Sequence, residues 1–136
     1  CEINSGMPQY CVSRVGEVLN NAGKPLKGSK VLMLGMAYKP NINDIRESPA
    51  IEMARLFIQY GCDFSYNDPF VPQVDIDGKT LKSAGLDKAV LEAADIVVIA
   101  TDHSAYDAAL IAESPRLVFD TRNLMAGIDG DNIHRL

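Results

Sequence analysis

Two basic residues stand where a cation can meet a ligand. Lys39 follows the apolar run 30–35, and Arg122 follows the run 115–120. Short apolar runs without alternation are typical of strands buried on both faces of a parallel sheet. Because parallel strands end at one edge of their sheet, we expect both cations on the same rim. There they would neutralise a phosphate-bearing ligand.

The first of these loops holds two further candidates. An aromatic ring at Tyr38 could cover a base or sugar face, and the planar guanidinium of Arg46 suits bidentate contact with a phosphate. The residues alone leave structural alternatives open. Lys39 could be solvated beside a packed Tyr38, and Arg46 could pair with Asp44 or Glu47 to fix the loop.

The known phosphate-binding motifs do not fit this loop. A G-x-G-x-x-G fingerprint lets pyrophosphate contact the backbone at a helix start, but Ala37 and Pro40 stand at the second and third glycine positions. No G-x-x-x-x-G-K-[ST] sequence occurs either. We therefore expect that this loop does not bind a dinucleotide by itself.

A catalytic triad is also not supported. Asp102, His103 and Ser104 follow the most apolar run, 95–100. Adjacent residues cannot place nucleophile, base and orienting acid in line, and no G-x-S-x-G sequence is present. We expect Asp102 or Ser104 to cap the following helix instead.

The composition fits one globular domain. The chain has 136 residues, a net charge of -5, 47% hydrophobic and 23% charged residues. The acidic balance and scattered basic residues argue against nucleic acid as a partner. No apolar run is long enough to cross a membrane, and no secretory signal begins the chain. Cys1, Cys11 and Cys62 form no C-x-x-C pair, so we expect no metal site and reduced thiols in a cytoplasmic protein.

Helices alternate with strands along the chain. Periodicity predicts helices over 9–22, 48–60, 86–94 and 105–111, and strands over 30–35, 63–67, 95–100 and 115–120. Segment 70–78 is expected to be irregular, 80–82 a short edge strand, and 132–136 a final short strand. The alternation predicts a Rossmann-like doubly wound α/β fold, with a mostly parallel sheet and helices on both faces. Ligands of such folds bind near the loops after the strands, here those after Gly35, Asn67, Ala100 and Asp120. Asp120 and Asn123 are expected to form turns.

Several segments together resemble one known family. The run 30–50, KVLMLGMAYKPNINDIRESPA, closely resembles the signature that begins the C-terminal domain of the UDP-glucose/GDP-mannose dehydrogenase family. Asn67-Asp68-Pro69 is similar to that family's strand-ending Asp-Pro, and 94–103 and 118–123 resemble later family segments. The resemblance implies that residues 1–23 end the central helical region, as a linker helix. Residues 24–136 would be the nucleotide-sugar-binding Rossmann-like domain.

The resemblance also implies a function. Enzymes of this family oxidise the C6 alcohol of a nucleotide sugar to a carboxylate with NAD⁺. Tyr38, Lys39 and Arg122 align with family positions that contact the UDP-sugar, and Arg46 aligns with an arginine that reaches NAD⁺ across the interdomain cleft. The Tyr-Lys pair and the D-I-R-E-S-P sequence look most like the branch that acts on UDP-N-acetylhexosamines. Polysaccharide biosynthesis is the family-level expectation.

Other family segments have no counterpart here. The catalytic C-x-P-K-D segment and the N-terminal G-x-G-x-x-G are absent from the sequence. We therefore expect an excised C-terminal domain with no catalytic residue of its own and no activity alone. Its partners would be the N-terminal and central domains of the same parent chain, a homo-oligomer in which the N-terminal domain binds most of the NAD. The alternatives are a non-catalytic Rossmann-like module for regulation or scaffolding, and a small independent NAD-binding oxidoreductase.

Overall fold

Parallel strands form the central sheet of the computed structural model, which describes residues 7–37, 48–122, 124–128 and 130–135. The strands are β1 (Lys30–Leu34), β2 (Asp63–Asn67), β5 (Ile96–Ile99), β6 (Val118–Asp120) and β7 (Ile133–Arg135). Their order is β2-β1-β5-β6-β7, and every neighbouring pair is parallel. The expected parallel sheet is confirmed, including a final short strand.

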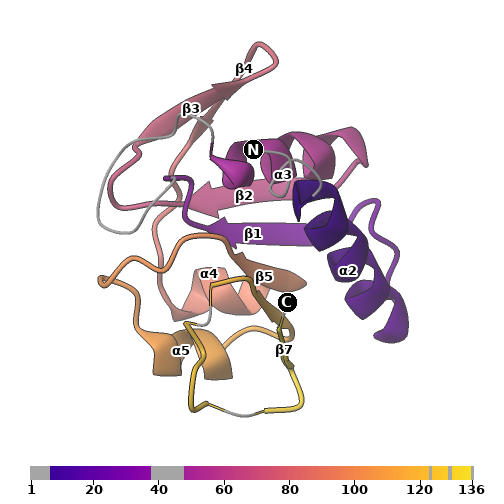
Figure 1. The fold of residues 1–136 in the computed structure, drawn as a ribbon, viewed down its shortest axis with the longest axis vertical. Helices are drawn as coiled ribbons and strands as arrows, with labels where there is room; N and C mark the ends of the chain where they lie inside the picture. Colours follow the sequence, from indigo (N-terminus) through magenta and orange to yellow (C-terminus); the bar gives the residue numbers. More distant parts are fainter. Residues whose placement is uncertain (1–6, 38–47, 123, 129, 136) are drawn as a thin grey trace.

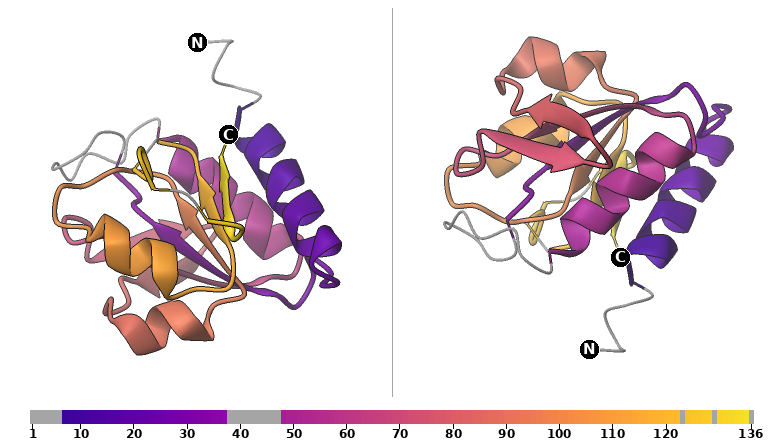
Figure 2. Two further views of the ribbon diagram at one scale, coloured as in Figure 1. Left: turned by 90° about the horizontal axis from the view of Figure 1, so that it is seen from below. Right: turned by 90° about the horizontal axis from the view of Figure 1, so that it is seen from above.

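Helices cover both faces of this sheet. α2 (Met7–Asn21) and α3 (Pro49–Gln59) lie on one face, and α4 (Lys88–Ala93) and α5 (Ala108–Glu113) lie on the other (Figures 1 and 2). Strand β1 divides its side chains between the two layers. Val31 and Met33 join the core under α2 and α3, whereas Leu32 and Leu34 join the core under α4 and α5. This two-sided burial explains the apolar run without alternation and confirms the doubly wound α/β fold.

Local signals in the sequence set the ends of α3. Ser48 caps its start, since the hydroxyl accepts a hydrogen bond from the Ala50 amide, and Pro49 fits the first turn. Gly61 follows the helix with a φ of 84°, a conformation that favours glycine. The Ser48 hydroxyl also donates to the Met36 carbonyl, so the start of α3 lies beside the loop that follows β1.

The N-terminal helix α2 packs into the same core as the sheet. Its buried residues recur at helical spacing and include Cys11, Val15, Val18 and Leu19. The boundary near residue 23 between a linker helix and the nucleotide-sugar-binding domain stays a prediction.

Two local expectations are wrong. Segment 70–78 is not irregular throughout, because β3 (Gln73–Ile76) pairs antiparallel with β4 (Lys79–Lys82) in a separate two-stranded sheet (Figure 1). Val74 and Ile76 alternate with exposed residues, and the connecting Asp77 and Gly78 have φ values of 51° and 84°. These are the features of a hairpin with a two-residue turn. The short strand expected over 80–82 is confirmed as β4, in this separate two-stranded sheet.

The second correction concerns α5. Neither Asp102 nor Ser104 caps this helix: Asp107 does, with its carboxylate accepting a hydrogen bond from the Leu110 amide at 3.2 Å. The helix begins later than expected, and the loop after β5 is correspondingly longer. In the part of the chain that the structure describes, no helix is long and apolar enough to cross a bilayer.

Candidate functional site at the carboxyl ends of the strands

The order of the strands reverses between β1 and β5, and a crevice at such a switch point is where doubly wound folds bind ligands. At this point Gly35 has a φ of 99°. A Cβ atom there would lie 2.3 Å from Cβ of Thr101 and 2.7 Å from its backbone nitrogen. The Leu34 carbonyl accepts from the amides of Ala100 and Thr101, at 2.8 and 3.1 Å. The two loops therefore leave the sheet in direct contact, which only glycine at position 35 allows.

Arg122 lies on this rim, where the turn after β6 holds it. The buried Asp120 carboxylate accepts hydrogen bonds from the amides of Arg122 (2.9 Å) and Met125 (2.8 Å), which confirms the expected turn-forming role. The guanidinium Nε donates to the Ala100 carbonyl at 2.9 Å. The Arg122 head group is thus fixed against the end of β5, one of the two switch strands. A guanidinium carries five N–H donors in a planar fork, which suits a phosphate.

The other predicted site residues, Tyr38, Lys39 and Arg46, lie outside the described residues, as does Asn123. The described residues on either side of segment 38–47 are held at the same rim. The Thr101 hydroxyl donates to the Ala37 carbonyl at 2.7 Å, and the Ser48 hydroxyl donates to the Met36 carbonyl at 2.8 Å. Ala37 and Ser48, the described residues on either side of segment 38–47, therefore both lie at the edge that carries Arg122.

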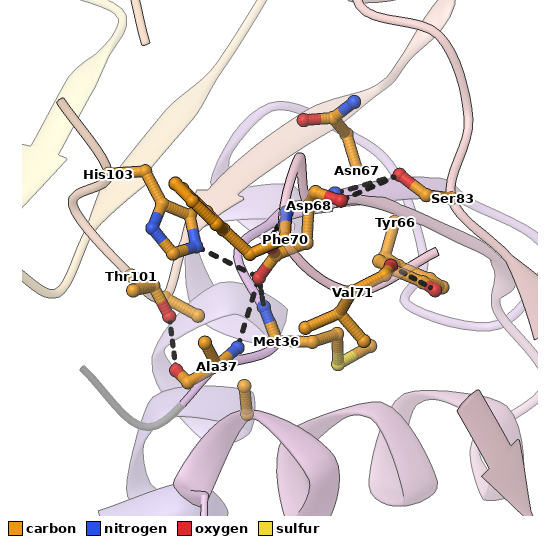
Figure 3. Close-up of polar contacts among 12 residues, drawn as sticks. Met36, Ala37, Tyr66, Asn67, Asp68, Phe70, Val71, Ser83, Thr101 and His103 are labelled. Atoms are coloured by element: carbon orange, nitrogen blue, oxygen red, sulfur yellow. Dashed lines mark hydrogen bonds and ion pairs between the residues drawn. The ribbon is translucent and has the colours of Figure 1, made fainter. Parts of the chain in front are cut away.

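A buried carboxylate to which the sequence analysis assigned no role in the site organises this edge. Asp68, 2% exposed, follows β2, and its Oδ2 accepts from the amides of Met36 (2.7 Å) and Ala37 (3.0 Å) (Figure 3). Oδ2 also lies 2.9 Å from Nε2 of His103, and Oδ1 accepts from the Phe70 amide at 2.7 Å. Burial alone raises the pKa of Asp68, but these hydrogen bonds outweigh it and hold the pKa below its usual range.

His103 has no exposed side-chain surface and lies between two aromatic rings. The Phe70 ring centroid is 4.9 Å from that of the imidazole, and the Tyr106 centroid is 5.6 Å away. The Tyr106 hydroxyl donates to the Asn67 carbonyl at 2.8 Å. Nε2 of His103 is directed at Asp68 inside the protein, whereas Ser104 is exposed.

A signal for this pair was present in the sequence. Asp68 and His103 each follow a strand of the parallel sheet, and the ends of parallel strands share one edge. An acid and a histidine placed in that way can meet.

The described thiols and acids give no sign of a second centre. Burial raises the pKa of Cys11, and it raises that of Cys62 to about 11, which opposes thiolate formation at neutral pH. Both thiols are free. Within ranges 7–37, 48–122, 124–128 and 130–135, no group of three His, Cys, Asp or Glu side chains could hold a metal ion.

Comparison with known proteins identifies the family of the chain. Residues 32–127 match the sequence profile of the UDP-glucose/GDP-mannose dehydrogenase family, UDP binding domain. The chain belongs to this family. Residues 32–127 thus correspond to the UDP binding domain of the family, as the resemblance implied.

The sequences and structures of known dehydrogenases are similar to this chain over nearly its whole length. The UDP-N-acetyl-D-mannosamine dehydrogenase of Escherichia coli K12 is 29% identical over 98% of this chain and 29% of its own length. The NDP-N-acetyl-D-galactosaminuronic acid dehydrogenase of Ralstonia solanacearum is 30% identical over 90% of this chain and 28% of its own length. The solved UDP-D-ManNAc dehydrogenase of Pyrococcus horikoshii superposes with a TM-score of 0.80 at 25% identity, over 98% of this chain and 31% of that one. This chain thus spans under a third of the length of each of these relatives.

The loop after β1 does not fit the pyrophosphate of NAD. In a dinucleotide-binding loop the first backbone amides after β1 face the pyrophosphate. Here the amides of Met36 and Ala37 are both bonded to the Asp68 carboxylate. The expectation that this loop does not bind a dinucleotide by itself therefore has a structural reason beyond its missing glycines.

Proposed function

We propose that this chain binds the nucleotide end of a UDP-sugar within an NAD-dependent nucleotide-sugar 6-dehydrogenase. The observation that carries the proposal is the placement of Arg122 at the switch point of a UDP-binding domain, with its Nε anchored on Ala100. A fixed guanidinium offers charge-assisted hydrogen bonds to a diphosphate at little further entropic cost.

The remaining site residues take the roles that the resemblance implies. Lys39 adds a second cation to the diphosphate, and Tyr38 contacts the nucleotide sugar. Arg46 reaches NAD⁺, which is bound mainly by the N-terminal domain of the parent chain and accepts hydride from the sugar when bound. This chain contributes binding and orientation, and no catalytic residue.

Calorimetry with UDP tests the binding role. Arg122→Ala should weaken UDP binding by about tenfold to 100-fold, because a charge-assisted hydrogen bond contributes roughly 1.5–3 kcal/mol. Arg122→Lys should recover only part of this, since an ammonium lacks the bidentate fork. The matched control is Arg55→Ala. Arg55 pairs with Asp77 and Glu52, away from this rim, so its loss should leave UDP affinity unchanged. Equal affinity in the Arg122 variants and the wild type would refute the proposal.

The proposed substrate is a UDP-N-acetylhexosamine. Support comes from the relatives, several of which are named UDP-N-acetyl-D-mannosamine dehydrogenases. The parent chain would be a cytoplasmic homo-oligomer that supplies sugar acids for polysaccharide biosynthesis. Residues 1–23 would link the domain to its central helical region. NADH formation by the longer polypeptide with a panel of UDP-sugars tests the substrate. Turnover of UDP-glucose and of no other UDP-sugar would refute the proposed substrate. Turnover by the 136-residue chain would refute the proposed inactivity of the isolated domain.

A further inference from the structure

The amides that would bind a phosphate in a dinucleotide fold are already bonded to an anion here. Met36 and Ala37 are the first residues after Gly35, and both donate to Oδ2 of Asp68. The hydroxyl of Ser48, the cap of α3, holds the Met36 carbonyl at 2.8 Å. Asp68, the first residue after β2, thus places its carboxylate at the end of β1. In dinucleotide-binding Rossmann folds the pyrophosphate lies at the corresponding end of the first strand.

We propose that Asp68 is a built-in anion that fills this phosphate cradle, and that Asp68 and His103 are positioning residues for the nucleotide. The positioning role rests on the proposed function, since it concerns the same UDP. The filled cradle explains why a doubly wound domain takes a UDP-sugar through cationic side chains on its rim. A dinucleotide held by loop amides is excluded because its phosphate would meet a buried carboxylate.

The contacts of Asp68 join three loops at one point. Met36 and Ala37 belong to the loop after β1, Phe70 to the loop after β2, and His103 to the loop after β5. All four donors are directed at one buried carboxylate, which resembles the way a protein surrounds a bound anion. Removing one of these donors leaves the buried Asp68 charge with fewer hydrogen bonds, in the protein interior, where each such hydrogen bond is strong.

The loop after β1 leads directly to the proposed UDP-binding residues. The amide of Ala37 is fixed by Asp68, and its carbonyl is fixed by Thr101. Tyr38 and Lys39 follow at once in the chain. Both polar backbone groups of Ala37, the last described residue before Tyr38 and Lys39, are therefore bonded, and its amide is bonded to the carboxylate that His103 contacts.

Chemical rescue tests the built-in anion without UDP. Asp68→Ala leaves a cradle of amides and His103 that a formate ion fits. Formate should raise the Tm of Asp68→Ala by about 5 °C more than it raises that of the wild type. Sodium chloride at equal ionic strength controls for salt. The matched variant is Asp107→Ala, which also loses a carboxylate bonded to a backbone amide, but at an exposed helix cap. Equal formate effects in the two variants would overturn the built-in anion.

Two His103 variants test positioning and do not depend on the Asp68 variant folding. His103→Gln keeps an N–H donor near the Nε2 position, whereas His103→Leu removes it. In calorimetry, UDP should bind His103→Leu about tenfold more weakly than wild type, and His103→Gln should stay within about threefold of wild type. A folded His103→Leu with wild-type affinity, or equal losses in both variants, would overturn the positioning role. Failure of the wild-type chain to bind UDP would overturn the proposed function together with this positioning role, while the formate measurement still decides the built-in anion.

Discussion

Replacing Gly35 by alanine should be among the most damaging single changes in this fold. Two independent costs apply at this position. An L-residue at a φ of 99° is strained by about 1–2 kcal/mol, and a Cβ 2.3 Å from Thr101 forces an overlap that costs about 1–3 kcal/mol. The overlap includes the backbone nitrogen of Thr101 at 2.7 Å, so a rotamer change cannot relieve it. We expect a loss of about 3 kcal/mol in the free energy of unfolding, or roughly 10 °C in Tm.

Two other glycines separate the costs. Gly28 has a φ of 85° but nothing within 4 Å of a built Cβ, so Gly28→Ala should lose about 1 kcal/mol from strain alone. Gly85 has neither the positive φ nor a close neighbour, so Gly85→Ala should stay within about 0.5 kcal/mol of wild type. Urea denaturation followed by circular dichroism measures all three. If Gly35→Ala loses no more stability than Gly28→Ala, the close contact of the β1 and β5 loops does not constrain this position.

Three further outcomes follow from burial and hydrogen bonding. Asp68→Asn should lower the free energy of unfolding by about 2 kcal/mol at pH 7, because the side-chain amide cannot accept from every donor. Since the pKa of Asp68 is lowered in the folded state, this deficit should shrink as the pH falls below about 4. Urea titrations that show the same deficit at every pH would contradict this. Cys62, with its pKa raised to about 11, should react with iodoacetamide at pH 8 roughly 100-fold more slowly than an ordinary thiol, as measured by peptide mass spectrometry, and at the ordinary rate in urea. Phe57→Ala should lose about 3–5 kcal/mol, because Phe57 is fully buried and stacks on Phe64, whereas Tyr60→Ala, at an exposed position, should change stability by under about 0.5 kcal/mol in the same denaturation assay.

The sheet could be predicted because its signals are local and strong. Strands β1 and β5 are apolar on both faces, and such runs separated by helical periodicity have few alternative arrangements. The hairpin was missed because only Val74 and Ile76 carry its alternation, and Pro72 beside them reads as a loop signal. The Asp77-Gly78 pair was the decisive feature of the turn.

The site was predictable only in part. Arg122 could be placed on the rim because it directly follows a strand. The pairing of Asp68 with His103 depends on which strands are neighbours across the switch point, and on the lengths of two loops. Neither is encoded in spacing along the chain, since the two residues are 35 positions apart. The cap of α5 was misplaced for a similar reason, because three acids or hydroxyls near residue 105 compete for that role.

The central position of β1 has a consequence for how the molecule folds. Its pairing with β2 spans only the intervening loop and α3, but its pairing with β5 joins Val31 to Ile96, 65 residues later. Contacts of such long range close late and slowly, after the local hairpin and helices have formed. These two strands meet at the switch point, where the UDP site is proposed, so that site is complete only after their long-range pairing has formed. A ribosome-bound chain truncated before residue 96 would lack β5, β6 and β7, and with them the β1–β5 edge and Arg122, on which the proposed site depends.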